Sequence, residues 1–131
     1  MNSSVSVAKI AELLDLKNFT DEIDLKKRKI TTTDINRPAL QLTGYFEHFE
    51  ESRVEIIGNV EYAYIQQMSD EEKRIRYDAF LKFDIPCVIF SRNLTPDPIF
   101  LKEALANQVP VLGTGRSTSE FTAVLIYTLG E

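Results

Sequence analysis

The stretch IPCVIFSR, residues 85–92, indicates the fold of this chain more directly than any other segment. Every residue from Ile85 to Phe90 is apolar or small. A continuous apolar run of this length is typical of a strand that is covered on both faces, as in a parallel sheet flanked by helices. Cys87, the single cysteine, lies inside this run, so we expect a buried thiol without a disulfide partner.

Strand and helix signals alternate on both sides of this run. Ser69 with Glu72, and Ser117 with Glu120, form capping-box patterns that predict helix starts. The strands expected in this part of the chain are 53–59, 85–92 and 109–112, with a helix at 60–68 after the first of them. A second helix follows Ser69, and its apolar stripe is Ile75, Ala79, Phe80 and Phe83. After the strand at 85–92 we expect a helix with Asp97 as N-cap and Pro98 at its first position, which ends near Asn107, and after Ser117 a last helix with a stripe of Phe121, Val124, Leu125, Thr128 and Leu129.

This alternation predicts an α/β fold with a mostly parallel sheet and helices on both faces, because links of this length usually make right-handed crossovers. In the amino-terminal part we expect a helix at 7–14 capped by Ser6, a loop, and a strand in RKITTTDI, residues 28–35. The stretch INRPALQLTG, residues 35–44, should be a loop and a helical turn around Pro38, with Leu40 and Leu42 anchored inward. No repeat or linker is visible, so residues 1–131 are expected to form a single domain.

Composition excludes several functions. The net charge of −5 argues against a nonspecific nucleic-acid surface, which needs clustered Lys and Arg. No apolar stretch approaches the roughly 20 residues of a membrane span, and the first residues lack the pattern of a secretion signal. We therefore expect a cytoplasmic protein without a membrane or nucleic-acid partner.

A candidate anion site follows from the predicted sheet. In open α/β sheets, ligands bind outside the carboxyl ends of the strands. The loops at those ends carry arginine, hydroxyl and amide side chains, and the start of the last helix adds unpaired N–H groups. The candidate anion-binding residues are Asn36, Arg37, Arg92, Thr114, Ser117 and Thr118. The alternative is structural: Ser117 would only cap its helix and Gly115 would only turn the chain.

The sequence offers no catalytic, cofactor-binding or metal-binding set. His48 is the only histidine, and no second histidine or cysteine lies at ligand spacing, which argues against zinc. As a general base, His48 would need an orienting carboxylate, for which Glu47 and Glu50 are near only in sequence. GTGRST, residues 113–118, lacks the third glycine of a dinucleotide fingerprint, and no Walker A motif is present.

Two segments carry a resemblance to a known family. TTTDINRPALQLTGYFEHF, residues 31–49, followed by RVEIIGNVEYAYI, residues 53–65, closely resembles the amino-terminal domain of bacterial HPr kinase/phosphorylase. The later segments 83–98 and 109–129 are also similar to that family. Ala39 departs from the glycine usual there, so we expect helical rather than left-handed backbone at this position.

The resemblance implies a fold similar to the substrate-binding domains of muramyl ligases. It also implies that the catalytic P-loop kinase domain is absent from this chain and would begin shortly after residue 131. The full-length enzyme would use ATP or pyrophosphate with Mg to phosphorylate a regulatory serine of HPr, and would reverse this by phosphorolysis in carbon catabolite control. Its expected partners are its own carboxyl-terminal kinase domain, HPr and further copies in a hexamer.

Two functional hypotheses remain for these residues. The first is a structural or regulatory domain of such a bifunctional enzyme, inactive by itself and without a cofactor of its own. The second is a stand-alone α/β sensor domain that binds a phosphorylated or carboxylate metabolite through Arg37, Arg92 and Ser117.

Overall fold

A five-stranded sheet forms the centre of the computed structural model, which describes residues 4–130. The strand order is β2-β7-β6-β5-β4, with β2 antiparallel to β7 and the other neighbours parallel. The predicted α/β class with a mostly parallel sheet is therefore confirmed. The elements are β1 (Val5–Ser6), α1 (Val7–Leu13), β2 (Lys17–Asn18), a 3-10 helix (Leu25–Lys27), β3 (Lys29–Ile30), β4 (Ile35–Asn36), α2 (Ala39–Leu42), β5 (Val54–Ile57), α3 (Asn59–Gln66), α4 (Asp70–Leu81), β6 (Val88–Phe90), α5 (Pro98–Ala106), β7 (Val111–Gly113) and α6 (Thr118–Leu129).

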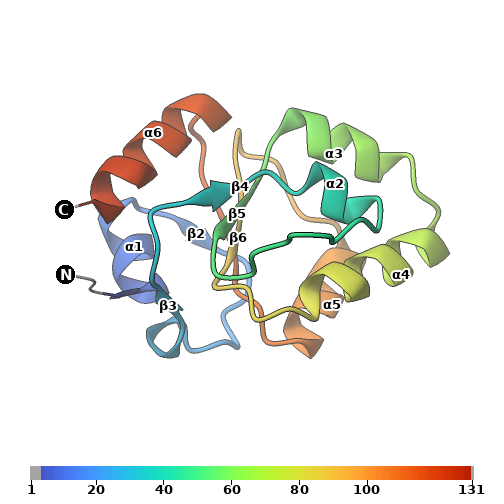
Figure 1. The fold of residues 1–131 in the computed structure, drawn as a ribbon, viewed down its shortest axis with the longest axis horizontal. Helices are drawn as coiled ribbons and strands as arrows, with labels where there is room; N and C mark the ends of the chain where they lie inside the picture. The colour runs from blue at the N-terminus through green and yellow to red at the C-terminus, as the bar shows by residue number, and fades with distance from the viewer. Residues whose placement is uncertain (1–3, 131) are drawn as a thin grey trace.

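Helices cover both faces of this sheet. Figure 1 shows α1 and α6 on one side and α2, α3, α4 and α5 on the other. The strands β4 to β7 follow one another across the sheet in sequence order, so right-handed crossovers place all the connecting helices on the same face. The last helix, α6, follows β7 onto the opposite face, where it joins α1.

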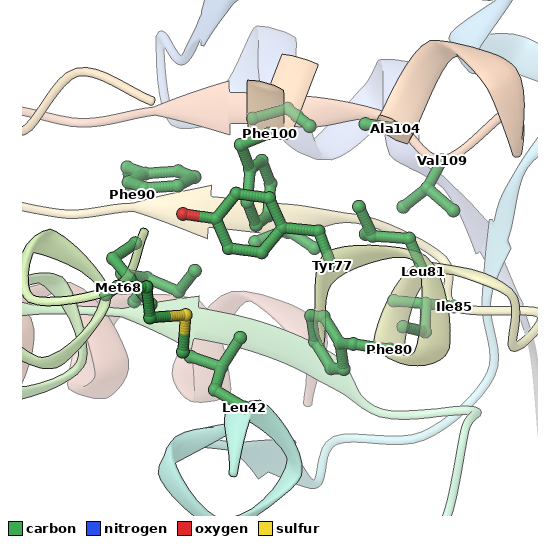
Figure 2. Packing of buried hydrophobic residues seen from close by; sticks show 14 residues of the cluster. Leu42, Met68, Tyr77, Phe80, Leu81, Ile85, Phe90, Phe100, Ala104 and Val109 are labelled. Carbon is green, nitrogen blue, oxygen red and sulfur yellow. The ribbon is translucent and has the colours of Figure 1, made fainter. Parts of the chain in front are cut away.

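Two apolar cores fill the space between the sheet and its helices. The core under α1 and α6 contains Ile10, Ile56, Ile89, Phe121 and Leu125, among others. The core under α3, α4 and α5 is rich in aromatic residues (Figure 2). There the Phe100 ring packs edge-on against Tyr77 and Phe90, with ring centroids 4.9 and 5.2 Å apart. The run 85–90 is buried throughout, as its composition predicts, although only Val88–Phe90 is regular strand.

The predicted helix starts are confirmed. Ser6, Ser69, Asp97 and Ser117 each stand at an N-cap, and each side chain accepts a hydrogen bond from a backbone N–H three residues on. Pro98 occupies the first turn of α5, and Asn107 is its C-cap. Ala39 begins α2 and is not among the residues with positive φ, so its backbone is helical as expected.

The strand predicted in residues 28–35 is only partly correct, because the segment contains parts of two short strands rather than one continuous strand. Lys29–Ile30 pairs with β1 in a separate two-stranded sheet, whereas Ile35–Asn36 pairs with β5 in the main sheet. Between them, the Thr32 hydroxyl accepts a hydrogen bond from the Asp34 N–H at 3.1 Å. A local bond of this kind offers the backbone an alternative to a strand ladder. The residues expected to be a loop before residue 28 also include β2, which is only two residues long.

Two side chains predicted to face inward are exposed instead. Leu40 is 59% exposed, whereas Leu42 is fully buried. The two lie two positions apart on a single helical turn, so they point to different sides of it. In α4, Ile75 is also 59% exposed, because Tyr77, Phe80 and Leu81 form the buried face.

The register of the parallel strands sets the level at which their loops leave the sheet. Ile57 of β5 is paired with Phe90 of β6, and Phe90 with Gly113 of β7. The ladder continues one residue further, since the Ser91 N–H donates to the Ile57 carbonyl at 3.0 Å and the Thr114 N–H donates to the Phe90 carbonyl at 2.9 Å. The loops after β5, β6 and β7 therefore start side by side at one edge.

No helix in residues 4–130 is long and apolar enough to cross a membrane.

Candidate functional site

A groove of about 580 Å³ lies at the carboxyl edge of the sheet. It is bordered by the residues that follow β4, β5 and β6 and by the first turns of α3 and α6. Three of the six predicted anion-binding residues, Arg37, Arg92 and Thr118, line it. The other lining residues are Ile35, Asn59, Val60, Ser119, Thr122 and Ala123.

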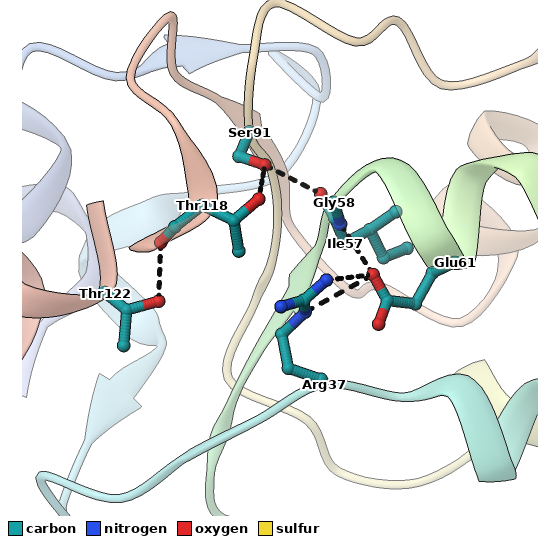
Figure 3. Close-up of polar contacts among 7 residues, drawn as sticks. All are labelled: Arg37, Ile57, Gly58, Glu61, Ser91, Thr118 and Thr122. Atoms are coloured by element: carbon teal, nitrogen blue, oxygen red, sulfur yellow. Dashed lines mark hydrogen bonds and ion pairs between the residues drawn. The ribbon is translucent and has the colours of Figure 1, made fainter. Parts of the chain in front are cut away.

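Arg37 is fixed on one side by an ion pair with Glu61 of α3. Its Nη2 and Nε atoms donate to Glu61 Oε1 at 2.7 and 3.3 Å. The same oxygen accepts the Gly58 N–H at 2.8 Å, and the Glu61 side chain is only 3% exposed. Figure 3 shows the guanidinium of Arg37 between Glu61 and the α6 residues Thr118 and Thr122. One carboxylate therefore joins the loop after β4 to the start of α3.

Gly58 allows three polar side chains to come together at this edge. A Cβ atom on Gly58 would lie 2.4 Å from Thr118 Oγ1, 2.9 Å from Arg37 Nη2 and 3.4 Å from Ser91 Oγ. Ser91 Oγ and Thr118 Oγ1 are themselves 2.6 Å apart, and Ser91 Oγ also donates to the Ile57 carbonyl at 3.3 Å. The φ of Gly58 is −116°, a value open to any residue, so glycine is needed here for space rather than for backbone conformation.

Arg92 lies in a tightly held loop. Arg92 and Asn93 both have a φ of 58°, in the left-handed region that non-glycine residues rarely adopt. Their N–H groups donate to the carbonyls of Arg116 at 2.8 Å and Thr114 at 2.9 Å. The Arg92 side chain is exposed and forms no hydrogen bond or ion pair with any residue in the range 4–130. Its charge is therefore not neutralised within this part of the chain.

The other three predicted residues do not line the groove. Asn36 Nδ2 donates to Gln41 Oε1 at 3.0 Å and to Glu55 Oε1 at 2.7 Å, within a polar cluster under α2. Thr114 Oγ1 accepts the Arg116 N–H at 3.2 Å. Ser117 caps α6 by accepting the Glu120 N–H at 3.2 Å, in agreement with the structural alternative.

Glu55 is a buried carboxyl group that sequence reasoning missed. It is fully buried in β5, and its Oε2 atom has no hydrogen-bond partner among the described residues. Burial raises the pKa of Glu55 from 4.5 to about 7, while the hydrogen bond from Asn36 and the charge of Arg53 oppose that rise. The sequence did contain a signal for this buried carboxyl group, namely an acidic residue within the otherwise apolar run VEIIG, residues 54–58. The groove residues Ser119 and Thr122 were also not predicted, because nothing in their local sequence sets them apart.

No catalytic constellation accompanies the groove. Residues 4–130 contain no group of three or more His, Cys, Asp or Glu side chains placed to hold a metal ion. His48 is exposed, with a φ of 62°, and does not belong to the groove lining. Burial raises the pKa of the Cys87 thiol to about 12, which keeps it protonated and unreactive near neutral pH.

The family model and similar curated proteins point to the same family. The family model described as HPr Serine kinase N terminus matches residues 5–129. The chain is 41% identical to the HPr kinase/phosphorylase of Lachnoclostridium phytofermentans over 123 residues, which covers 94% of this chain and 40% of that protein. It is 40% identical to the HPr kinase/phosphorylase of Caldicellulosiruptor bescii over 116 residues, which covers 88% of this chain and 37% of that protein. The chain thus spans about two fifths of the length of these curated relatives.

The fold is shared with known structures, of which one illustrates the likeness. The CBS and DRTGG domains of the regulatory region of Clostridium perfringens pyrophosphatase, complexed with the activator diadenosine tetraphosphate, match with a TM-score of 0.62 and 15% sequence identity. The match covers 95% of this chain and 47% of that one. At this identity the likeness shows a common fold and carries neither a role nor a ligand over to this chain.

Proposed function

The chain belongs to the family of HPr serine kinase N-terminal domains, and we propose that it serves as the structural and regulatory domain of a bifunctional HPr kinase/phosphorylase. The observation that carries this proposal is the family match over residues 5–129, together with relatives that continue well beyond the matched part. In such an enzyme a carboxyl-terminal kinase domain would use ATP or pyrophosphate with Mg to phosphorylate a serine of HPr, and would remove the phosphate by phosphorolysis. The complete protein would act in the cytoplasm as a homo-oligomer.

Catalysis would then belong to residues outside this chain. Phosphoryl transfer needs a phosphate-binding loop and a metal held near the transferred group. The sequence has no Walker A motif, and the strongly perturbed carboxyl of Glu55 is enclosed in the sheet, out of reach of a substrate. We therefore expect the isolated chain to leave HPr unphosphorylated when it is mixed with ATP or pyrophosphate and Mg.

A regulatory domain also needs a surface through which it contacts the rest of the protein. Val60 and Tyr127 are the most exposed large apolar side chains in residues 4–130, at 68% and 71%. Val60 is the second residue of α3 and lines the groove, and Tyr127 lies on α6, which starts at the same groove. A kinase domain that docked against these helices would sense any change at the groove directly.

The test uses a full-length HPr kinase/phosphorylase that carries this domain. Its rates of HPr phosphorylation and dephosphorylation, and its oligomeric state, would be compared with those of a version that begins after residue 130. We expect the shortened protein to retain chemistry but to lose part of its regulation or its assembly. Rates, effector responses and oligomeric state that all stay unchanged after the deletion would contradict the proposal.

A further inference from the structure

The groove at the carboxyl edge of the sheet has a local charge opposite to that of the whole chain. The formal net charge of the protein is −5. Yet the nine lining residues in the described part of the chain include two arginines and no acidic residue. The Glu61 carboxylate that pairs with Arg37 is buried and is not part of the lining. A hollow with this lining attracts anions.

The two arginines differ in how their charges are balanced. Arg37 uses Nε and Nη2 for Glu61, which leaves its Nη1 atom without a partner in residues 4–130. The Arg92 side chain has no partner in that range, while the Arg92 N–H donates to the Arg116 carbonyl and the neighbouring Asn93 N–H donates to the Thr114 carbonyl. Arginine presents several N–H donors in a planar fork that matches the oxygens of a phosphate or carboxylate. Arg92 is therefore placed to bind an anion without first breaking an internal ion pair.

Further hydrogen-bond donors lie around the same hollow. Asn59 and Val60 are the first two residues of α3, and Thr118 and Ser119 are the first two of α6. The first N–H groups of a helix have no partner within the helix and favour negative charge. These groups add to the attraction of the arginines, which alone carry full charges in the lining.

The size and apolar part of the groove indicate the kind of anion. Its volume of about 580 Å³ falls within the roughly 300–1,000 Å³ typical of small-molecule sites. Ile35, Val60 and Ala123 supply apolar lining beside the arginines. We propose that the groove binds a phosphate monoester of a small organic molecule, with the phosphate on Arg92 and Arg37 and the organic part against these apolar residues. The proposal goes beyond family membership and does not depend on a role in HPr phosphorylation.

Isothermal titration calorimetry with this chain tests the proposal. The probes are adenosine 5′-monophosphate and glucose 6-phosphate, with adenosine, glucose and inorganic phosphate as comparisons at the same ionic strength. At least one ester should bind, its phosphate-free parent should not, and inorganic phosphate should bind more weakly than the ester. The two esters distinguish a nucleoside body from a sugar body. Failure of both esters to bind at millimolar concentration, or equally tight binding of inorganic phosphate, would overturn the proposal.

A pair of arginine variants locates the site. Arg92→Ala should weaken binding of the ester by about tenfold or more, since a hydrogen bond to a charged group contributes roughly that factor. Because the Arg92 side chain makes no contact of this kind in residues 4–130, the variant should keep the melting temperature of the unliganded chain. The control is Arg74→Ala, which removes an exposed arginine of α4 outside the groove and should leave affinity unchanged. Equal affinity in Arg92→Ala and the parent chain would show that the ester binds elsewhere and would refute the assignment.

Discussion

The guanidinium of Arg37 and the carboxylate of Glu61, 24 positions apart in the sequence, meet at 2.7 Å between Nη2 and Oε1. Glu61 also accepts the Gly58 N–H at the start of α3, so it orders the helix and the arginine together. The Glu61 side chain is almost fully buried, whereas that of Arg37 is 38% exposed toward the groove. The pair therefore orients one wall of the groove and leaves part of the arginine accessible.

The first prediction concerns the loss of this ion pair. Arg37→Ala should lower the free energy of unfolding by about 2 kcal/mol, because a buried carboxylate would keep only its bond to a backbone N–H. The partial exposure of Arg37 holds the effect below that of a fully buried pair. Urea unfolding of both proteins measures the difference.

The control for Arg37→Ala is the exposed ion pair between Arg116 and Glu120, whose nitrogen and oxygen are 3.4 Å apart. Arg116→Ala should change stability by no more than about 0.5 kcal/mol. An equally small effect of Arg37→Ala would mean that the Glu61 carboxylate is stabilised adequately without the arginine.

The second prediction tests the close approach at Gly58. In Gly58→Ala the new methyl group would lie 2.4 Å from Thr118 Oγ1, an atom held by Ser91. Arg37 can swing away, but the short threonine cannot, so we expect a loss of roughly 1–3 kcal/mol of stability. Thermal or urea unfolding provides the measurement.

A second substitution at Thr118 identifies the cause. In the Gly58→Ala background, Thr118→Ala removes the clashing atom and should recover part of the lost stability. Thr118→Val keeps a methyl group at that position and should recover none. Equal stability of the two double variants would assign the loss to some contact other than Thr118 Oγ1.

Local sequence predicted the helices of this fold better than its polar contacts. N-caps such as Ser69 and Asp97 accept hydrogen bonds from backbone N–H groups three residues away, so a pattern of four residues is enough to predict where a helix begins. Arg37 with Glu61, and Asn36 with Glu55, are joined only through the pairing of β4 with β5. The strand register that brings such residues together depends on the whole sheet, so it cannot be predicted from any one segment of the sequence.

Only three of the six predicted anion-binding residues line the groove, again because contacts between strands cannot be predicted from local sequence. The rule that ligands gather at the carboxyl ends of strands selected Arg37, Arg92 and Thr118 correctly as neighbours. It could not show that Asn36 turns toward Glu55, because that depends on a carboxyl group buried in the next strand. Short elements also carry little periodicity, which explains the errors at Leu40 and within residues 28–35.

The third prediction concerns α2, where sequence could not separate Leu40 from Leu42. Leu42→Ala should cost roughly 2–5 kcal/mol, since it opens a cavity in a core position with no exposed surface. Leu40→Ala should change stability by less than about 0.5 kcal/mol, because that side chain is mostly in solvent. Urea unfolding of the two variants side by side checks both values, and similar losses would contradict the packing of α2.

The last prediction is a pH dependence that originates at Glu55. Its pKa is raised from 4.5 to about 7 in the folded protein. Between these values the folded protein retains a proton that the unfolded chain has released, so unfolding releases a proton and becomes more favourable as the pH rises. The protein should lose about 3 kcal/mol of stability between pH 4 and pH 8, since each pKa unit corresponds to about 1.4 kcal/mol. Glu55→Gln, which cannot ionise, should lack this loss.

The decisive quantity is the difference between the two stability curves, because other titrating groups are common to both proteins. Glu71→Gln, at an exposed position of α4, should follow the curve of the parent chain. Parallel curves for the parent and Glu55→Gln would show that the Glu55 carboxyl keeps an ordinary pKa, which would require solvent or a hydrogen-bond donor to reach its Oε2 atom.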